Sequence, residues 1–383
     1  MNSHICHVIT TLGAGGAEQY VVQLSNHLLT QGHRVSIVAG EPQLLRERLS
    51  AGIHIETLRL HPGATRSLVT YLRILLPAIR RLVAYFRSEG VTVVHTHLAA
   101  SALPAWIAAK ICRIPVIHSR MYTKAIPSSY ERILFASRLH LLFVNYFLAF
   151  TRYMEGEIRQ YWRVPAERIV LSSIGVDTER FAPNALEREI GRRNFGIADG
   201  ERVMLVVARF HPEKNVELAI RAARAMDDPG AVLLIVGDGP QRAFLEALVR
   251  DLLGRTPIRF LGLLQDPRPA YAAADVLVQT TRGPNLGTVV LEAMASGVPV
   301  AIAWRDEEER KMAEDTFDGL NLGVIARATP KSLASAMKAL LDDRNRLQAL
   351  RQEVRNFVER RHARQPVYQA MADFYMTLRP CVE

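Results

Sequence analysis

The sequence predicts an α/β protein with two doubly wound domains, and three observations lead to this prediction. Its 383 residues exceed what one ordinary hydrophobic core requires and suit two domains of ordinary size. Short β-rich runs alternate with longer amphipathic segments, a pattern typical of parallel sheets covered by helices. Two such series occur, and turn formers with a proline near residues 175–200 separate them. We therefore expect one domain over residues 1–180 and a second over residues 181–363.

Each half supplies its own set of strands. In the first half, the opening strand is followed by a glycine turn and by a helix from about Ala17. The strands expected there span 7–12, 34–40, 92–97, 114–119 and 145–151, with 167–170 closing the half. The second half supplies strands at 202–209, 231–237, 258–262, 274–280 and 298–303, with helices such as 216–226 and 241–253. Residues 331–379 form a final helical segment, and its last helix, about 364–383, is expected to pack back on the first domain.

The composition is that of a globular protein, because 49% of the residues are hydrophobic and 22% are charged. The cysteines Cys6, Cys112 and Cys381 show neither a zinc-binding nor a disulfide spacing and suit a reducing compartment. No apolar run of the sequence is long enough to span a bilayer, and the first residues resemble a strand and a turn rather than a signal peptide. We therefore expect a cytoplasmic protein. The net charge of +10 favours anionic partners, which are nucleotide phosphates, acidic lipid surfaces or nucleic acid.

Two features of the first half indicate a ligand site. Residues Gly13 to Glu18 form a glycine turn between a strand and a helix, where unpaired backbone N–H groups attract phosphate. The run departs from the dinucleotide fingerprint at Glu18, and a turn that only packs is an equal alternative. His97 and His118 are expected at the carboxyl ends of successive strands in the same layer, where open α/β sheets bind ligands. A histidine there can donate a hydrogen bond or transfer a proton, although a lone histidine is more often structural.

The second half carries cations after its opening strand. Arg209 ends that strand and Lys214 follows at an expected helix start, so the two form a pocket suited to a diphosphate. Neutralising a leaving diphosphate is the main electrostatic requirement when a nucleotide sugar is cleaved, whereas solvated cations are the plain alternative. Gly237 and Gly239 let the backbone approach a base or a phosphate. Asp238 between them either contributes to that site or caps the following helix.

Residues 284–300 carry the most specific motif. A loop rich in backbone donors leads into a helix that carries Glu292 and ends at Gly297. Glu292 follows the loop by about one and a half helical turns, so it can accept both hydroxyls of a ribose whose phosphates bind the helix N-terminus. Its apolar neighbours predict partial burial, and a buried acid needs a partner; a solvated carboxylate is the alternative. The loop donors are Asn285, Leu286, Gly287 and Thr288, and Val289 follows them.

In their order and spacing, these motifs resemble the retaining GT-B glycosyltransferases of family 4 over the whole chain. The resemblance implies two Rossmann-like domains facing each other across a cleft, with a nucleotide-sugar donor bound mainly by the C-terminal domain and an acceptor mainly by the N-terminal one. The matching stretches are GGAE (15–18), HTH (95–97), GVD with F (175–181), R with EKN (209–215), GDGP (237–240), LEAMASGVPV (291–300) and DGLNLG (318–323).

The resemblance also implies roles for individual residues. Arg209 and Lys214 would hold the diphosphate, Glu292 would hold the ribose, and His97 would lie near the transferred sugar and the reacting centre. The leaving diphosphate would help to deprotonate the acceptor, and neither a metal nor another cofactor is implied. Further donor contacts are expected from Gly15, Gly16, Gly237, Asp238, Asn285, Leu286, Gly287, Thr288 and Val289, and His118 and Arg120 are candidates on the acceptor side.

One position departs from the family pattern. The family carries a glutamate eight residues before the position of Glu292, where it contacts the transferred sugar, and this chain has Pro284 there. Asn285 or Arg282 could replace that contact, and the identity of the donor sugar stays open. Residues 304–315 likewise replace a glycine-rich loop of the family.

A basic stripe is expected on a helix of the first half. Residues 57–88 contain six arginines and no acid, and apolar residues flank the stripe. Such a face suits an anionic membrane surface, and a solvated outer helix face is an equal alternative. Pro77 is expected to interrupt this helix. The arginines that recur every seven residues on one face are Arg66, Arg73, Arg80 and Arg87.

We therefore expect a metal-independent, retaining hexosyltransferase at the inner face of the membrane. It would transfer a sugar from a UDP- or GDP-sugar to a glycan or lipid-linked acceptor in polysaccharide or glycolipid synthesis. Nucleic acid is not expected as a partner, because no recognition motif with interleaved aromatic residues occurs. A nucleotide-sugar epimerase or a phosphorylase on the same plan is one alternative. A catalytically silent binding subunit is another, which Pro284 favours and the retained Arg209, Lys214, His97 and Glu292 disfavour.

Overall fold

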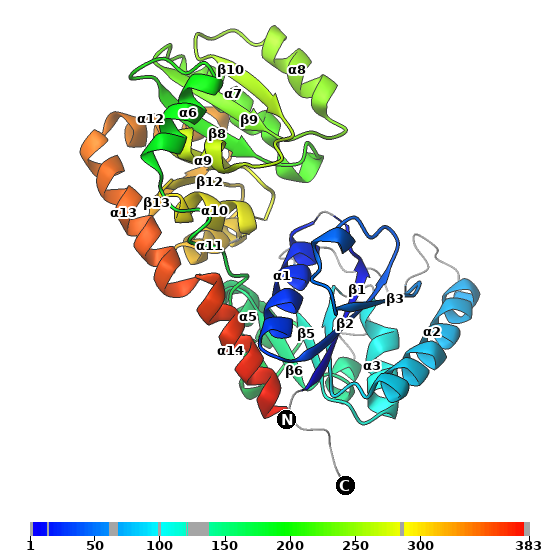
Figure 1. Ribbon diagram of the computed structural model, residues 1–383. Coiled ribbons are helices and arrows are strands. Elements are labelled where there is room, and N and C mark those ends of the chain that lie inside the picture. Colours follow the sequence, from blue (N-terminus) through cyan, green and yellow to red (C-terminus); the bar gives the residue numbers. More distant parts are fainter. Residues whose placement is uncertain are drawn as a thin grey trace. The chain divides into compact units, whose positions relative to one another are not determined.

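The computed structural model describes residues 3–13, 15–60, 68–98, 101–119, 121, 138–283 and 287–378, with the backbone alone for 68–72. The chain divides into two compact units (Figure 1). Unit 1 comprises Met1–Ile174 together with Gln365–Glu383, and unit 2 comprises Gly175–Arg364. Each unit is a parallel sheet covered by helices, so the expected α/β class is confirmed.

Unit 1 contains a sheet of seven described strands in the order β3-β2-β1-β4-β5-β6-β7. The chain runs from β1 to one edge, then crosses to β4 on the other side of β1 and continues to the opposite edge. The strands are β1 (His4–Thr11), β2 (Arg34–Gly40), β3 (His54–Thr57), β4 (Val93–His97), β5 (Val116–Ser119), β6 (Tyr146–Ala149) and β7 (Ile169–Leu171). The α-helices are α1 (Gly16–Thr30), α2 (Leu68–Glu89), α3 (Ala102–Ile111), α5 (Arg152–Gln160) and the C-terminal α14 (Arg364–Thr377).

Unit 2 repeats this plan with six described strands in the order β10-β9-β8-β11-β12-β13. The strands are β8 (Arg202–Val207), β9 (Ala231–Val236), β10 (Ile258–Gly262), β11 (Val276–Gln279), β12 (Val300–Trp304) and β13 (Gly323–Arg327). The α-helices are α6 (Ala185–Asn194), α7 (Val216–Met226), α8 (Arg242–Asp251), α9 (Arg268–Ala273), α10 (Thr288–Ala295), α11 (Glu307–Thr316), α12 (Pro330–Asp342) and α13 (Arg344–Arg361).

The central strands are apolar because helices cover both faces of each sheet. Every residue of β9 is buried, as the unbroken run AVLLIV predicts for a parallel strand. Helix α7 buries one side of its surface, including Val216, Ile220 and Ala223 at helical spacing, and it packs beside α12. The core therefore fixes the strand ends, which carry the residues of interest.

Helix α14 belongs to unit 1 although its sequence follows unit 2. Tyr368, Met371 and Tyr375 are buried in the core of unit 1. The Tyr368 hydroxyl donates to Gln23 Oε1 at 3.1 Å, and the Tyr375 hydroxyl lies 2.5 Å from His95 Nδ1. The last described helix thus completes the first sheet's core.

Three features differ from the expectations. The strands β3 and β13 were not expected; β3 is a partly exposed edge strand of four residues, too short for a clear alternation. Pro77 does not split its helix, because α2 continues from Leu68 to Glu89 and Pro77 lies on the exposed side, away from the core.

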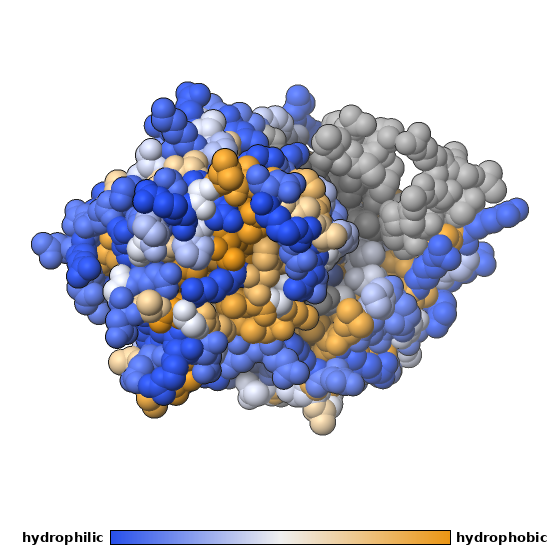
Figure 2. Space-filling view, turned by 90° about the horizontal axis from the view of Figure 1, so that it is seen from above, coloured by the Kyte–Doolittle hydropathy of each residue, from blue (hydrophilic) through white to orange (hydrophobic). Residues whose placement is uncertain are grey.

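Hydrophilic side chains predominate around the rim of the face shown in Figure 2, with hydrophobic side chains nearer its centre. None of the described helices is long and apolar enough to cross a membrane.

Candidate functional site

In each unit the strand order reverses between two neighbouring strands, and open α/β sheets bind ligands at the carboxyl ends of such a pair. In unit 1 the pair is β1 and β4, and in unit 2 it is β8 and β11. His97 is the last residue of β4. Arg209 follows β8, and the segment leading to α10 follows β11. Together with the glycine turn after β1, four of the expected regions therefore follow strands between which the strand order of their own sheet reverses.

The turn that carries Arg209 packs closely against two glycines. A Cβ atom at Gly237 would lie 1.9 Å from the carbonyl oxygen of Ala208, and one at Gly239 would lie 2.7 Å from that of Phe210. Both glycines also have a positive φ, at 136° and 154°. The Phe210 N–H donates to the carbonyl of Asp238 at 2.8 Å. The absent side chains thus make room for the turn itself, a structural reason for glycine that the sequence interpretation did not give.

Asp238 is exposed, and its carboxylate accepts hydrogen bonds from the Gly239 N–H at 2.7 Å and from Arg242 at 3.1 Å. Asp238 therefore contacts Arg242, the first residue of α8, but Gln241 is the N-cap residue and no side chain caps this helix among the described residues, so the capping alternative is wrong.

Hydrogen bonds join the turn around Lys214 to the segment after β11. The Thr280 hydroxyl donates to the carbonyl of Lys214 at 2.9 Å, and the Arg282 N–H donates to the carbonyl of Glu213 at 2.8 Å. The exposed Arg209 guanidinium lies 3.4 Å from Glu213 Oε1. The structure therefore brings Arg209 and Lys214 beside the segment that leads to α10.

Helix α10 starts without a side-chain cap among the described residues. Gly287 is its N-cap residue in an extended conformation, and no side chain accepts from the first turn. The backbone N–H groups of Thr288 and Val289 lack acceptors within the helix, so this end attracts anions. Pro284, Asn285 and Leu286 lie outside the described residues.

Glu292 lies in the second turn of α10, between the buried Leu291 and Ala293. The Tyr271 hydroxyl donates to its Oε2 at 2.8 Å. Burial raises the pKa of Glu292 to about 7, and the Tyr271 hydrogen bond opposes this rise. The carboxyl group is thus partly buried with a partner, and it titrates near neutral pH.

A second acid, Glu309 in α11, was missed by the sequence interpretation. It is 2% exposed, and its carboxylate accepts from the Gly283 N–H at 3.0 Å and from the Arg305 N–H at 2.9 Å. The Arg305 guanidinium also contacts it. Glu309 therefore anchors the segment that leads to the N-terminus of α10. It stands within the run DEEER, where the sequence offers no signal to separate it from its exposed neighbours.

In unit 1, three histidines lie together on one face of the sheet. His7 in β1 is paired in register with His95 in β4, and His97 follows two residues later on the same face. His7 Nδ1 lies 3.0 Å from His97 Nε2. All three side chains are fully buried, and burial lowers the pKa of each, that of His7 to about 3. The contribution of His7 was also missed.

His118 does not share a layer with His97, so that expectation is wrong. His118 is paired in register with Thr96, and its Nδ1 lies 3.0 Å from the Thr96 hydroxyl. Because side chains alternate along a strand, Thr96 and His118 face the side of the sheet opposite to His97. His118 packs there against Trp106 and is buried. Arg120 lies outside the described residues.

The glycine turn of unit 1 leads into α1, with Gly15 as N-cap residue and Gly16 as the first helical residue. A Cβ atom at Gly15 would lie 2.4 Å from Glu18 Oε2. A carboxylate therefore already lies beside this helix N-terminus, and an anionic ligand would have to displace it.

The His7, His95 and His97 cluster is the one group in the described part of the chain whose ligand atoms lie close enough for a metal, within 4.8 Å of one another. Both nitrogens of His95 already have partners, the Tyr375 hydroxyl and the Ser119 hydroxyl at 2.6 Å. The ring centroids of His95 and His97 lie 4.0 Å apart, and the ring planes are tilted by 37° to each other. This arrangement favours a hydrogen-bonded cluster over a metal site.

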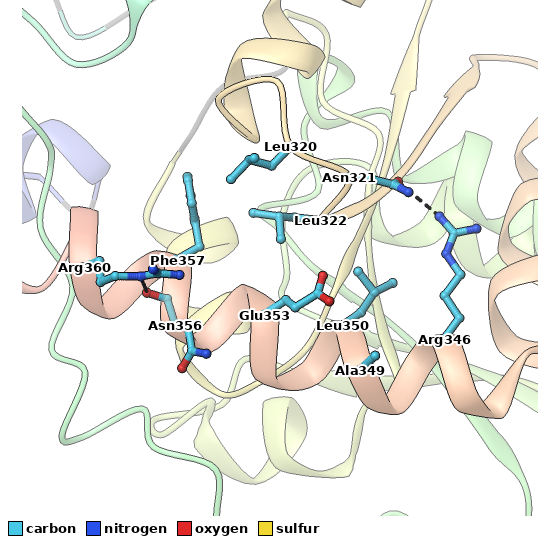
Figure 3. A pocket seen from close by; sticks show the side chains of 10 residues that line it. All are labelled: Leu320, Asn321, Leu322, Arg346, Ala349, Leu350, Glu353, Asn356, Phe357 and Arg360. Carbon is cyan, nitrogen blue, oxygen red and sulfur yellow. Dashed lines mark hydrogen bonds between the residues drawn. The ribbon is translucent and has the colours of Figure 1, made fainter.

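Two depressions of unit 2 lie at the amino end of its sheet, away from these residues. One, of about 520 Å³, lies between the segment before β13 and α13; Figure 3 shows Leu320 and Leu322 on one side and Glu353 on the other, with Asn321 hydrogen-bonded to Arg346 at 3.2 Å. The other surrounds Asp275, where Arg188, Arg192 and Arg351 converge on one carboxylate. These arginines also bind backbone carbonyls, so they stabilise the junction of α6, α9 and α13.

Comparisons with known proteins match both halves of the chain. Residues 14–180 match the model of the family described as Glycosyltransferase Family 4, and residues 187–357 match that described as Glycosyl transferases group 1. A GDP-mannose-dependent alpha-mannosyltransferase of Mycobacterium tuberculosis is 33% identical over 304 residues, which cover 74% of each chain. A D-inositol 3-phosphate glycosyltransferase of Thermobispora bispora is 27% identical over 374 residues, covering 88% of this chain and 84% of that one.

Among solved structures, a glycosyltransferase of Rickettsia africae has a TM-score of 0.81 at 16% identity and covers 98% of both chains. Anabaena HepE in complex with UDP-glucose has a TM-score of 0.79 at 19% identity, covering 98% of this chain and 100% of that one. At these identities the likeness concerns the fold.

Proposed function

The chain belongs to the family 4 glycosyltransferases and has their GT-B fold, and on this premise we propose that it transfers a sugar from a UDP- or GDP-sugar to a glycan or lipid-linked acceptor with retention of configuration. The related mannosyltransferase is described as GDP-mannose-dependent, and the HepE structure contains UDP-glucose. Both names support a nucleoside-diphosphate donor.

The observation that carries the proposal is the arrangement after β8 and β11. Hydrogen bonds from Thr280 and Arg282 hold the turn of Lys214 against the segment leading to α10. Two cations and a helix N-terminus that no described side chain caps thus lie at the carboxyl edge of one sheet, with Glu292 one turn further along α10. This set matches a nucleoside diphosphate, with phosphates at the cations and ribose hydroxyls at the carboxylate.

The proposed reaction places these groups where charge develops. As the bond between the anomeric carbon and the diphosphate oxygen breaks, negative charge grows on the diphosphate, and Arg209, Lys214 and the N–H groups of α10 stabilise it. An acceptor hydroxyl forms the new bond on the face that the diphosphate leaves, and its proton passes to the departing phosphate. Because the two side-chain cations supply this charge, we expect turnover to persist after treatment with EDTA.

A thermal-unfolding screen against UDP-, GDP- and ADP-sugars tests the donor site. A ligand at 100 times its Kd that binds only the folded chain stabilises it by about 2.7 kcal/mol, so the true donor or its nucleotide raises the unfolding temperature. Slow release of the same nucleotide would report turnover. We expect Lys214→Ala to lose most of this stabilisation, whereas Lys331→Ala, an exposed lysine of α12, should retain it. Equal shifts in both variants would contradict the role of Lys214.

Pro284 gives a second candidate function, a silent nucleotide-sugar-binding subunit, since the family has a sugar-contacting glutamate there. This candidate would be favoured by a nucleotide sugar that stabilises the folded protein but releases no free nucleotide, even when extracts that contain acceptors are supplied.

We also propose that the acceptor is presented at an anionic membrane surface. Arg73, Arg80 and Arg87 are exposed on one face of α2, and Leu76, 56% exposed, lies among them. The opposite side of α2, with Leu82 and Phe86, is buried in the core. Arg66 lies outside the described residues. A basic face with an exposed apolar side chain suits anionic headgroups.

Vesicle co-sedimentation tests this proposal. The protein should bind vesicles of phosphatidylglycerol and phosphatidylcholine but not phosphatidylcholine alone, and added salt should weaken the binding. A triple change of Arg73, Arg80 and Arg87 to Glu should abolish it. The charge-matched control changes three exposed arginines of α13, Arg344, Arg346 and Arg360, to Glu. Equal loss in both triple variants would indicate attraction by net charge and not by α2.

A further inference from the structure

A depression at the amino end of the sheet of unit 2 is lined by more cations than acids. It has a volume of about 780 Å³, which is within the range of small-molecule sites. It lies where α6 and α13 meet the residues just before β8 and β11, so the length of the sheet separates it from Arg209 and Lys214. Its acids are Glu201 and Asp275, and its cations are Arg188, Arg192, Arg202, Arg344 and Arg351.

Three of these arginines share the buried carboxylate of Asp275. Arg188 lies 2.7 Å and Arg351 lies 2.6 Å from its Oδ1. Arg192 lies 3.9 Å from its Oδ2. Burial lowers the pKa of Arg192 and of Arg351, and the charge of Arg188 lowers both further, against the attraction of the carboxylate. Three guanidinium groups thus repel one another around a single negative charge.

The remaining acid of the depression does not remove this excess. Arg202 forms ion pairs with two acids outside the depression, Asp228 and Asp342. The Glu201 carboxylate accepts from a backbone N–H at 2.9 Å and, together with Asp199, favours the charged form of Arg192. With Arg202 balanced, the other four lining arginines face the two lining carboxylates, so the depression keeps a net positive charge.

Helix α13 presents hydrogen-bond donors to this depression. Arg344, Gln348 and Arg351 are four and three residues apart, so they lie on one face of the helix. Arg344 and Gln348 are exposed, and their side chains form no hydrogen bond or ion pair with the described residues. Arg351 uses its Nη2 for Asp275 and for the carbonyl of Ala274. Its Nε and Nη1 form no hydrogen bond within the described part of the chain.

Two helix N-termini add to the positive potential of the depression. Helix α6 begins at Ala185 and α13 begins at Arg344, and both residues line it. The N-cap residues Asn184 and Asp343 each accept one backbone N–H of the first turn. The N–H groups that precede it in each helix have no acceptor within the helix, so both ends favour an anion, although the charge of Asp343 offsets part of this effect at α13.

We propose that this depression is a second anion site, which binds a small molecule with two phosphate groups through Arg344, Gln348 and Arg351. A guanidinium group binds two phosphate oxygens at once, and the amide of Gln348 donates between the two arginines. Arg344 and Arg351 are seven residues apart, about 10 Å along the helix axis, so two phosphate groups engage both more readily than one does. The ligand also balances the positive charge around Asp275.

Hydrogen exchange of the full chain, with pyrophosphate as the probe, locates the site. At constant ionic strength, pyrophosphate should slow exchange in α6 and in the part of α13 from Arg344 to Arg351. Inorganic phosphate should need a concentration about tenfold higher for the same protection. Pyrophosphate also suits the proposed donor site, where it would protect α10. Lys214→Ala should weaken the protection of α10 and leave that of α6 and α13 unchanged.

A double variant tests the residues of the site. Arg344→Ala combined with Gln348→Ala removes two of the three donors and should raise the Kd for pyrophosphate at α6 and α13 about tenfold or more. Because both side chains are exposed, unit 2 should remain folded, which thermal unfolding checks. The matched control Arg346→Ala removes another exposed arginine of α13, which bonds Asn321 instead, and should leave this Kd within about twofold of wild type.

These measurements do not depend on turnover, so their outcome is separate from that of the proposed transferase function. Protection confined to α10, or protection that sodium chloride reproduces at the same ionic strength, would overturn the proposal. An equal loss of affinity in the double variant and in Arg346→Ala would also overturn it, because it would indicate attraction by net charge alone. A nucleoside diphosphate and a hexose bisphosphate, used as competitors, distinguish linked from separate phosphate groups, and competition by either supports the site.

Discussion

At the scale of single residues, Glu292 combines burial with a function that requires charge. A carboxylate accepts both ribose hydroxyls, whereas a protonated carboxyl group accepts less well. With a pKa of about 7, Glu292 is half ionised near neutral pH. We therefore expect donor affinity to rise as pH increases through about 7.

Tyr271 sets the midpoint of that pH dependence. Its hydroxyl favours the ionised form of Glu292, so Tyr271→Phe should raise the pKa further and move the midpoint of donor binding to higher pH. Titration calorimetry with the donor nucleotide between pH 6 and 9 measures this. An identical pH dependence in wild type and variant would show that Glu292 does not bind the ligand as a carboxylate.

Glu292 also links stability to pH. Its pKa of about 7 in the folded chain lies above the ordinary value of 4.5, so the folded state binds the proton more tightly than the unfolded state. Its contribution to stability is therefore present below about pH 4.5 and is lost as pH rises through about 7. We expect Glu292→Gln to unfold at a higher temperature than wild type at pH 8 while binding donor more weakly. A lower unfolding temperature at pH 8 would contradict this assignment.

Gly237 tests whether the turn of Arg209 depends on the absent side chain. Ala at this position would press its Cβ atom against Ala208 and should cost about 2 kcal/mol of unfolding free energy and weaken donor binding. The control Gly262→Ala also has a positive φ, 71°, but its Cβ atom meets nothing within 4 Å. It should cost only about 1 kcal/mol, from backbone strain alone. If both variants lose the same free energy of unfolding in denaturant titrations, backbone strain and not the contact with Ala208 explains the glycine at position 237.

At the scale of elements, α11 supports α10 through one buried carboxylate. Glu309→Ala would leave the Gly283 N–H and Arg305 without their acceptor and should destabilise unit 2 by about 2–3 kcal/mol. Donor affinity should fall as well, because Gly283 leads to the N-terminus of α10. The matched control is Glu307→Ala, an exposed acid of the same helix. If calorimetry shows that Glu309→Ala binds the donor nucleotide as tightly as wild type, the contacts of Glu309 do not contribute to donor binding.

Sequence periodicity predicted the elements best where both faces are covered. Residues 216–226 coincide with α7, and residues 231–237 match β9 to within one residue, because the helical spacing and the apolar run are unbroken there. The edge strand β3 and the unbroken course of α2 were not predicted. Tertiary contacts decide whether a short edge strand pairs and whether a helix tolerates a proline such as Pro77. Likewise, the partners His7 and Glu309 come from other strands or helices, so no local pattern marks them.

At the scale of the whole molecule, the repeated strand order explains why the motifs come in two sets. Strands and helices alternate along the chain in both halves, and the sequence predicted this α/β plan. What it could not predict is the neighbour of each strand: that β1 adjoins β4 and β8 adjoins β11 follows from crossovers between distant segments.

The dependence of unit 1 on α14 can be measured in the intact chain. Tyr375→Ala removes a fully buried ring and should destabilise unit 1 by about 3 kcal/mol. Hydrogen exchange should then accelerate in Met1–Ile174 and remain as in wild type in Gly175–Arg364. The control Met376→Ala alters the next residue, which is 44% exposed, and should change little. Faster exchange in both units would contradict the expectation that the loss of the Tyr375 ring affects unit 1 alone.

The place of α14 has a consequence for synthesis on the ribosome. Translation proceeds from the N-terminus, so the segment of unit 2, Gly175–Arg364, leaves the exit tunnel before the helix that completes unit 1. Until Tyr368 and Tyr375 emerge, the helix-facing side of the first sheet, His95 included, lacks its final cover. The nascent chain should therefore present a finished second unit beside an unfinished first one, which makes the first sheet the region that chaperones would bind during translation.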